Sequence, residues 1–199
     1  CRIPKKGTIV RSHRFDKYIQ SNADFSKFKY ELEQFFSRDY IVSCDVRINT
    51  GGLNRPFDLD LALIHRKDAG IRINIEVDEP YSFFSREAKH CIGEDILRDD
   101  YFLDRGWVVI RFSEIQVHRN IEGCLRYVAE LMSQIDTNFE VPLSFLNYSR
   151  IKDDPLWDLV QAQKWEKSSY RESYIERELP ALTKPNNELD RSLNAQEIY

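Results

Sequence analysis

Two neighbouring segments of the chain alternate hydrophobic and polar residues in the manner of β-strands. In 57–64, Phe57, Leu59, Leu61 and Leu63 share one face, and Asp58, Asp60 and Ala62 share the other. In 71–78, Ile71, Ile73, Ile75 and Val77 lie opposite Asn74, Glu76 and Asp78. The connection 66–70 is short, polar and ends in a glycine. The two segments therefore predict a β-hairpin with one apolar and one acidic face.

Other segments predict helices and further strands. Aromatic and aliphatic residues recur every three or four positions in 25–37 and in 120–135, which is typical of amphipathic helices. The segment 91–104 also predicts a helix, with Gly106 as its C-terminal cap. The segment 40–48 is rich in β-branched residues and predicts a strand, whereas 49–52 predicts a loop. The continuous apolar run 107–112 is typical of a buried central strand.

This order of elements favours a mixed α/β (α+β) domain. We predict an N-terminal arm over 1–20, a core over 21–138 and a C-terminal extension over 139–199. The core follows the order αβββαβα, with its mixed sheet flanked by helices, and is not doubly wound because short turns link its first strands. The extension carries a helix over 157–178 and a flexible tail. The chain begins at Cys1 without an initiator methionine, so we expect it to be a segment of a longer chain.

Composition narrows the class of protein. The 199 residues are 42% hydrophobic and 31% charged, with a mean hydropathy of -0.55, and no apolar run is long enough to span a membrane. These values favour a soluble protein without a membrane association. The four cysteines are scattered and form no CxxC pair, which favours reduced thiols in a cytoplasmic protein. A net charge of -4 is not the usual footprint of a nucleic-acid-binding domain, but a carboxylate cluster that holds cations lowers the formal charge of its own protein.

The acidic face of the predicted hairpin is the main candidate for chemistry. If the strands pair antiparallel, Asp58, Asp60, Glu76 and Asp78 lie at one end of the sheet, opposite the Leu and Ile core. Crowded carboxylates raise one another's pKa, and a divalent cation removes that cost. Mg²⁺ bound by carboxylates, water and substrate phosphates suits phosphodiester cleavage. The alternative interpretation is that these acids form the solvated face of a strand.

The order of four short motifs resembles the PD-(D/E)XK nuclease superfamily, in particular the branch related to very-short-patch-repair endonucleases. The motifs are FDLDLAL (57–63), INIEVDEPY (73–81), RD (98–99) and GWVVIRF (106–112), and the resemblance covers about 24–132. It implies a restriction-endonuclease-like core that hydrolyses DNA with Mg²⁺ or Mn²⁺. In this chain Leu59 replaces the Pro of the superfamily motif, Glu79 replaces a frequent Gly, and Asp78 occupies the position where many relatives have Lys.

The resemblance also implies roles for individual residues. Asp60, Glu76 and Asp78 would be catalytic, and the metal would be bound by Asp60, Glu76 and the backbone carbonyl of Val77. Independently of the resemblance, Arg98 and Arg111 are candidates for phosphate contacts, because arginine binds phosphate in pairs, and Lys89 is a third candidate for contact with the nucleic acid. The alternative for Arg98 is a salt bridge or a position on the helix surface. Accessory roles are expected from Glu31, Asp58 and His90, for which the alternative is an ordinary surface position.

Three functions remain as hypotheses. The first is a metal-dependent endonuclease acting on DNA, within a larger DNA defence or repair protein, as a homodimer or in association with other domains. The second is a nuclease-like module that does not cut and binds nucleic acid or a protein partner, which the absence of Lys at position 78 favours. A Ca²⁺-binding structural domain is the third; the acids lie on strands and not in a Gly-containing ligand loop, which argues against it.

Overall fold

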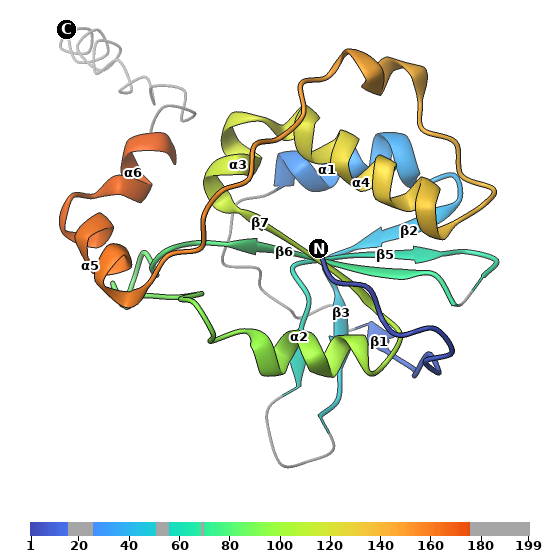
Figure 1. The fold of residues 1–199 in the computed structure, drawn as a ribbon, viewed down its shortest axis with the longest axis horizontal. Helices are drawn as coiled ribbons and strands as arrows, with labels where there is room; N and C mark the ends of the chain where they lie inside the picture. The colour runs from blue at the N-terminus through green and yellow to red at the C-terminus, as the bar shows by residue number, and fades with distance from the viewer. Residues whose placement is uncertain (16–25, 51–55, 69, 176–199) are drawn as a thin grey trace, which may run out of the picture.

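The computed structural model describes residues 1–15, 26–50, 56–68 and 70–175, and its centre is a four-stranded sheet (Figure 1). The strands lie in the order β2-β5-β6-β7. The predicted hairpin is confirmed, since β5 and β6 pair antiparallel, whereas β6 and β7 pair in parallel. The chain is thus a mixed α/β protein. The bounds of these strands are Tyr40–Ser43 for β2, Leu61–His65 for β5, Arg72–Asp78 for β6 and Val108–Ser113 for β7.

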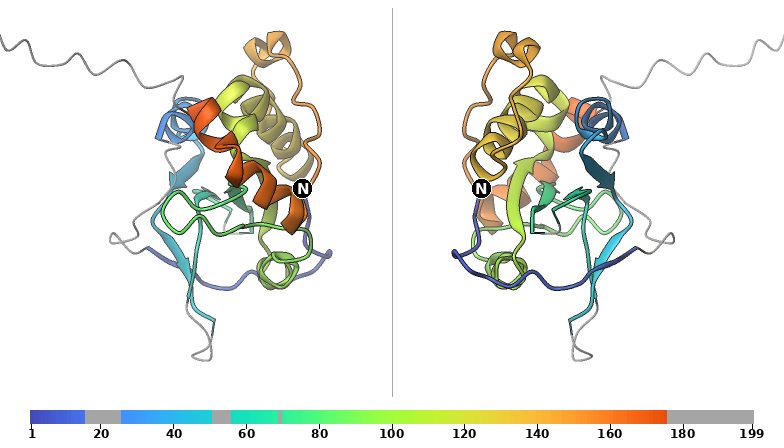
Figure 2. Two further views of the ribbon diagram at one scale, coloured as in Figure 1. Left: turned by 90° about the vertical axis from the view of Figure 1, so that its left-hand side faces the viewer. Right: turned by 90° about the vertical axis from the view of Figure 1, so that its right-hand side faces the viewer.

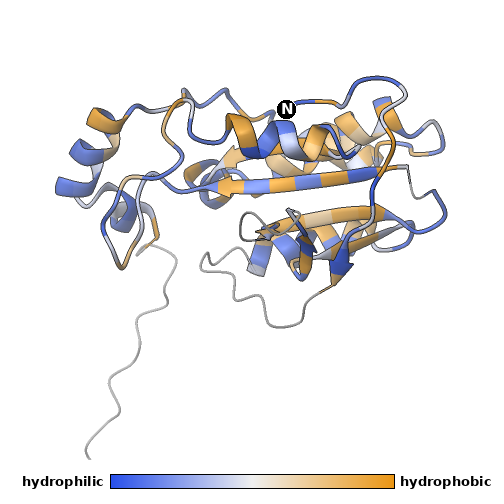
Figure 3. Ribbon diagram, turned by 90° about the horizontal axis from the view of Figure 1, so that it is seen from below, coloured by the Kyte–Doolittle hydropathy of each residue, from blue (hydrophilic) through white to orange (hydrophobic). Residues whose placement is uncertain are grey.

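Two helices cover one face of this sheet, namely α1 (Ser26–Phe36) and α4 (Ile121–Ile135) (Figures 1 and 2). α1 presents Phe28, Leu32 and Phe36, spaced by four residues and at most 1% exposed. They pack with Leu61, Leu63, Ile73 and Ile75 of the sheet and with the apolar side of α4. Hydrophobic residues concentrate in these central elements (Figure 3). Burial of this apolar surface is the main force that holds the layers together.

The opposite face carries α2 (Ile96–Leu103) and a smaller antiparallel sheet in the order β1-β3-β4. Its strands are β1 (Arg14–Phe15), β3 (Val46–Ile48) and β4 (Phe57–Asp58). A second core of Val46, Ile48, Ala62, Phe102 and Trp107 fills this side. The acidic side chains of β6, Glu76 and Asp78, face this same side of the large sheet.

Two segments that were each predicted to form one strand form two shorter strands instead. The segment 40–48 is not one strand but β2 and β3, and 57–64 is β4 and β5, with each pair divided between the two sheets. The chain turns the corner at Cys44–Asp45 and again at Leu59–Asp60. The amide of Asp45 donates to Ser43 Oγ at 3.0 Å at the first corner. Leu59 therefore joins the core under α2 instead of sharing a face with Leu61.

The predicted central strand 107–112 is β7, which stands at the end of the sheet order. It is buried because both of its faces are covered and because the N-terminal segment borders its free edge. The amide of Arg2 donates to the carbonyl of Val109 at 2.8 Å, and the amide of Val109 donates back at 2.9 Å. The predicted N-terminal arm thus contributes to both sheets, through Arg2 and through β1.

The remaining helices differ from prediction in their bounds. α2 starts at Ile96 instead of residue 91, and a short helix α3 (Glu114–Arg119), with a Ser113–Gln116 capping box, precedes α4. A 3-10 helix covers Leu143–Asn147. The predicted helix 157–178 is two helices, α5 (Leu159–Lys167) and α6 (Tyr170–Ile175), because Ser169 adopts a positive φ of 51°. The predicted tail lies outside the described residues. Among the helices described, none is long and apolar enough to cross a membrane.

Candidate functional site

β6 places three polar side chains in a row on the face of the sheet that α2 covers. Asn74, Glu76 and Asp78 are at most 5% exposed, while the alternate residues Ile73, Ile75 and Val77 point into the core under α1 and α4. The alternation predicted for this strand is therefore confirmed. Its acidic face is buried and not solvated. Burying carboxylates is costly unless they have partners, so the contacts of Glu76 and Asp78 determine what this face can do.

Asp60 approaches this row from the corner between β4 and β5. Its Oδ2 atom accepts a hydrogen bond from the amide of Val77 at 2.9 Å. Its Oδ1 atom makes no hydrogen bond or ion pair with any residue that the structure describes. Burial, and then repulsion by Glu76, raise the pKa of Asp60 to about 7, although the Val77 amide and Arg98 act against this rise. Near neutral pH, Asp60 therefore exchanges a proton readily.

Glu76 is held by Arg98, which comes from α2. Arg98 Nη2 donates to both carboxylate oxygens, at 2.8 and 2.9 Å, and also to the backbone carbonyl of Asp58 at 2.6 Å. The guanidinium lies over the rings of Phe57 and Phe102, which fixes its plane. The Nε atom of Arg98 is buried and has no hydrogen-bond partner among the described residues. On the other side, Asn74 Nδ2 donates to Glu76 Oε1 at 2.7 Å.

Asp78 is held by Arg111 from β7, the next strand of the sheet. Arg111 donates through Nε and Nη2 to the two oxygens of Asp78, at 2.8 and 2.6 Å, in the bidentate geometry of strong ion pairs. The same guanidinium contacts Asp99 Oδ1 at 2.8 Å and Asp95 Oδ2 at 3.0 Å. Burial raises the pKa of Asp78 despite the bond from Arg111. Arg111 thus gathers three carboxylates from β6 and α2.

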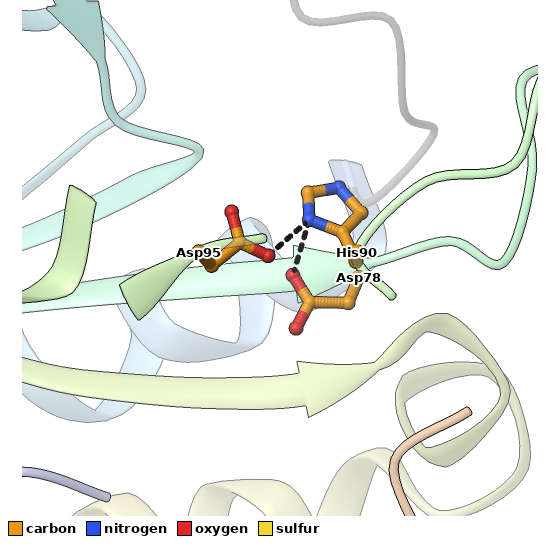
Figure 4. Close-up of side chains that lie close together, drawn as sticks. All are labelled: Asp78, His90 and Asp95. Carbon is orange, nitrogen blue, oxygen red and sulfur yellow. Dashed lines mark hydrogen bonds and ion pairs between the residues drawn. The ribbon is translucent and has the colours of Figure 1, made fainter. Parts of the chain in front are cut away.

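His90 completes this group, with Asp78 and Asp95 on either side of its Nδ1 atom (Figure 4). The Nδ1 atom lies 2.8 Å from Asp95 Oδ2 and 3.5 Å from Asp78 Oδ1, and these three side chains could together offer ligands to a metal ion. Burial acts to lower the pKa of His90, but the bond to Asp95 and the charge of Asp78 raise it above the ordinary value. Conversely, His90 and Arg111 lower the pKa of Asp95 against the effect of its burial.

The side chains that contact one another in the site include more carboxylates than cations. With every carboxylate ionised, the six carboxylates outnumber the three permanent cations and His90, which leaves a formal charge of -2 with His90 protonated and -3 with it neutral. Arg2 and Asp100 extend the network with one charge of each sign. The carboxylates are Asp60, Glu76, Asp78, Glu79, Asp95 and Asp99, and the cations are Lys89, Arg98 and Arg111.

Several predicted site residues lie outside this arrangement or play another part in it. Asp58 forms an ion pair with Arg47 of the small sheet, and its backbone carbonyl contacts the site by accepting a hydrogen bond from Arg98. Lys89 Nζ donates to Glu79 Oε1 at 2.9 Å. Glu31 lies on α1, which packs against the opposite face of the sheet, and no contact among the described residues joins it to the cluster. The backbone of Val77 contacts the candidate site through its amide, which donates a hydrogen bond to Asp60.

Sequence reasoning missed the acids that surround Arg111. Asp95 stands at the N-cap of α2 but makes no capping hydrogen bond there, and its carboxylate turns towards His90 instead. Asp99 is the partner of Arg98 in the RD motif, yet it contacts Arg111 of the neighbouring strand. Asp95 and Asp99 are four residues apart, at the N-cap and in the first turn of α2, and therefore lie on one face of the helix. This spacing is the sequence signal that could have identified them as a pair.

No protein-family model matches this chain, and the searches of curated proteins and of solved structures found no match either.

Proposed function

We propose that this protein is a metal-dependent endonuclease of the restriction-endonuclease-like type that hydrolyses DNA phosphodiester bonds. The proposal is supported by the position of the sequence motifs on the fold. The motif segments 57–63, 73–81, 98–99 and 106–112 all contribute to one buried face, although they come from different strands and a helix. A fold alone does not define a function, so the proposal depends on the chemistry of this face.

The observation that carries the proposal is the pair Asp60 and Glu76. Two carboxylates that repel each other at a buried site, one with a free oxygen and a pKa of about 7, hold a proton where a cation would be favoured. The surrounding network has an excess of negative charge, as counted above. Hard oxygen ligands of this kind suit Mg²⁺ or Mn²⁺.

The residues present therefore fit a divalent cation, which would be held by Asp60 and Glu76, with the carbonyl of Val77 as the expected third ligand. When bound, such an ion supplies a water nucleophile of lowered pKa and neutralises charge on the phosphate. The protein residues orient the site: Arg98 fixes the plane of Glu76, and Arg111 fixes that of Asp78. Asp60 Oδ1 is available to accept a proton or to bind the ion. His90, with its raised pKa, is placed to exchange protons at the edge of the cluster.

A second candidate is a nuclease-like module that does not cut and binds nucleic acid or a protein. One observation favours it: Glu76 and Asp78 already have arginine counterions, and Asp78 stands in place of the usual Lys. Internal counterions compete with a metal for the same carboxylates. The two candidate functions therefore differ in whether a metal ion displaces the arginine counterions from Glu76 and Asp78.

Plasmid cleavage in Mg²⁺ and in Mn²⁺ tests the proposal. We expect cleavage by the parent protein, and a loss of at least about 100-fold in Asp60→Asn and in Glu76→Gln, because each removes a metal ligand. Glu122→Gln, the same change on the exposed side of α4, should cleave like the parent. If the parent does not cleave, or if both site variants cleave as fast as the Glu122 control, the enzymatic proposal is wrong.

A further inference from the structure

A second charged feature lies on the same side of the large sheet, next to the carboxylate site. It is a hollow of about 360 Å³ between the N-terminal segment, β3 and the end of α2. The residues that line it include Arg11, His13, Arg14, Arg47, Tyr101 and Arg105. No aspartate or glutamate is among the lining residues in the described part of the chain. Four arginines thus gather in one hollow of a protein whose net charge is -4.

The charges in this hollow are not all satisfied from within the protein. Arg11 and Arg14 are exposed, and neither guanidinium contacts a residue that the structure describes. Arg105 lies against the ring of Tyr101, 3.3 Å from its centroid, and donates to the carbonyl of Tyr101. Arg47 pairs with Asp58 from the edge of the hollow. Arg11 and Arg14 thus bring two positive charges to the hollow without a described acid beside them, and an anion bound between them would be stabilised.

The backbone of the N-terminal segment holds these arginines in place. The amide of Arg11 donates to the carbonyl of Arg105 at 3.3 Å, and the carbonyl of Arg11 accepts from Arg72 Nη1 at 2.8 Å. Arg14 pairs with Arg47 across β1 and β3. The arginines therefore come from three segments that the fold fixes relative to one another, and they do not form a run of basic residues in the sequence.

The hollow is connected to the candidate active site through one residue. The side chain of Asp58 binds Arg47 of the hollow, and its backbone carbonyl accepts from Arg98, which holds Glu76. Asp58 thus joins the arginine hollow to the carboxylate site by direct contacts on both sides. Arg98 and Arg111 were candidates for phosphate contacts, but both guanidinium groups pair with carboxylates of the site, so other cations are needed to contact the phosphates of a substrate.

We propose that this arginine hollow binds the sugar–phosphate backbone of DNA and positions it for the carboxylate site. Arginine suits this role because its planar fork binds phosphate oxygens in pairs. The identity of the anion rests on the proposed nuclease function, whereas the presence of an anion site rests on the hollow itself. Phosphate contacts of this kind give affinity and orientation without sequence preference.

Binding of a short fluorescein-labelled DNA duplex, followed by fluorescence anisotropy in EDTA, tests the proposal without any cleavage. The double variant Arg11→Gln/Arg14→Gln should bind about tenfold more weakly. The slope of log K against log salt, over about 50 to 200 mM NaCl, should become shallower by about 1.8, since two phosphate contacts are lost. Arg11→Lys/Arg14→Lys keeps the charges and should recover most of the binding.

The matched control is Arg38→Gln/Lys67→Gln, which removes two charges from exposed turns outside the hollow. We expect it to bind like the parent. Equal weakening in both double variants, or no weakening in the Arg11/Arg14 variant, would overturn the proposal, provided that circular dichroism shows each variant folded. These outcomes are independent of plasmid cleavage, so failure of the arginine hollow and failure of the nuclease proposal are separately visible.

Discussion

One terminal nitrogen of Arg98, Nη2, donates to both carboxylate oxygens of Glu76, at 2.8 and 2.9 Å. Glu76 is buried in this pair, whereas the Arg98 side chain is 24% exposed. Loss of Arg98 would therefore leave the charge of Glu76 out of water without its counterion. The same contact places a protein cation beside the carboxylate that a metal would use. Arg98 is therefore both a structural partner and a competitor for the proposed ligand.

Replacing Arg98 by glutamine should reveal that competition. In EDTA we expect Arg98→Gln to lower the free energy of unfolding by about 3–5 kcal/mol, because Glu76 is left without its counterion. In saturating Mn²⁺ the loss should be smaller, since the metal supplies the missing charge. Urea unfolding in both media measures the difference, with the exposed Arg38→Gln as a control. A loss of equal size in both media would mean that no cation reaches Glu76.

Asp60 should make the protein less stable as the pH rises. Its pKa increases from 3.8 in the unfolded chain to about 7 in the folded protein. Between these values the folded state holds a proton that the unfolded state has lost, so the free energy of unfolding decreases with pH, by a few kcal/mol in all. Urea unfolding at about pH 4 and about pH 7 in EDTA measures this, and Asp60→Asn should abolish most of it.

His90 acts in the same direction at higher pH. Its folded-state pKa lies above the ordinary value, so its stabilising contact with Asp95 is present below about pH 6.5 and is lost as the pH rises through the folded pKa. The Asp60→Asn variant should keep this smaller decrease. A pH dependence of the parent and of Asp60→Asn that is identical from about pH 4 to pH 7 would contradict the assignment of Asp60.

Binding of Mn²⁺ should depend on pH through the same proton. Because the ion displaces the proton of Asp60, its affinity should rise by about tenfold per pH unit up to about pH 7 and then level off. Isothermal titration calorimetry across this range measures the slope. Glu76→Gln should bind at least about tenfold more weakly at every pH. Affinity that is flat with pH and unchanged in Glu76→Gln would place the metal elsewhere.

The C-terminal helices are attached to the core by a second buried ion pair. Arg171 of α6 is 3% exposed and donates to both oxygens of Glu114, and Tyr174 donates to the same carboxylate at 2.7 Å. Arg171→Ala should cost about 3–5 kcal/mol of unfolding free energy, whereas Lys167→Ala, on the exposed side of α5, should cost little. Urea unfolding measures the cost. Limited proteolysis should cut the Arg171 variant first near α5 and α6; cleavage unchanged from the parent would show that the pair does not anchor them.

The elements that could be predicted from the sequence are those whose pattern is set by local periodicity. β6 alternates over seven residues between apolar side chains in the core under α1 and α4 and polar side chains on the face under α2, so both its type and its faces follow from the order of residues. α1 and α4 follow from their spacing of apolar residues. The corners at Cys44–Asp45 and Leu59–Asp60 could not be predicted in this way. Both halves of each segment have strand-like composition, and the second core under α2 decides where the chain changes sheets.

Three carboxylates of the candidate site, Asp60, Glu76 and Asp78, were predicted from the sequence, whereas Asp95, Asp99 and the arginine partners of Glu76 and Asp78 were not. Asp60 and Glu76 meet because β5 and β6 pair next to the corner, which the hairpin pattern implied. Arg98 and Arg111 were candidates for phosphate contacts, with a salt bridge as the alternative for Arg98. In the structure each pairs with an acid, 22 and 33 residues away in sequence. Such contacts depend on the parallel pairing of β7 with β6 and on the placement of α2, and neither follows from local periodicity.

The corner at Asp60 has a mechanical consequence. Leu59 is still hydrogen-bonded to Val46 of the small sheet, and Leu61 already pairs with Ile75 of the large one, so Asp60 is the residue at which the two sheets join in this segment. If the small sheet tilted relative to the large one, the peptide between Leu59 and Asp60 would rotate with the small sheet. The peptide between Asp60 and Leu61 would stay with the large sheet. Because β3 lines the arginine hollow, a load applied there would act on the peptide before Asp60 and would reorient this single carboxylate.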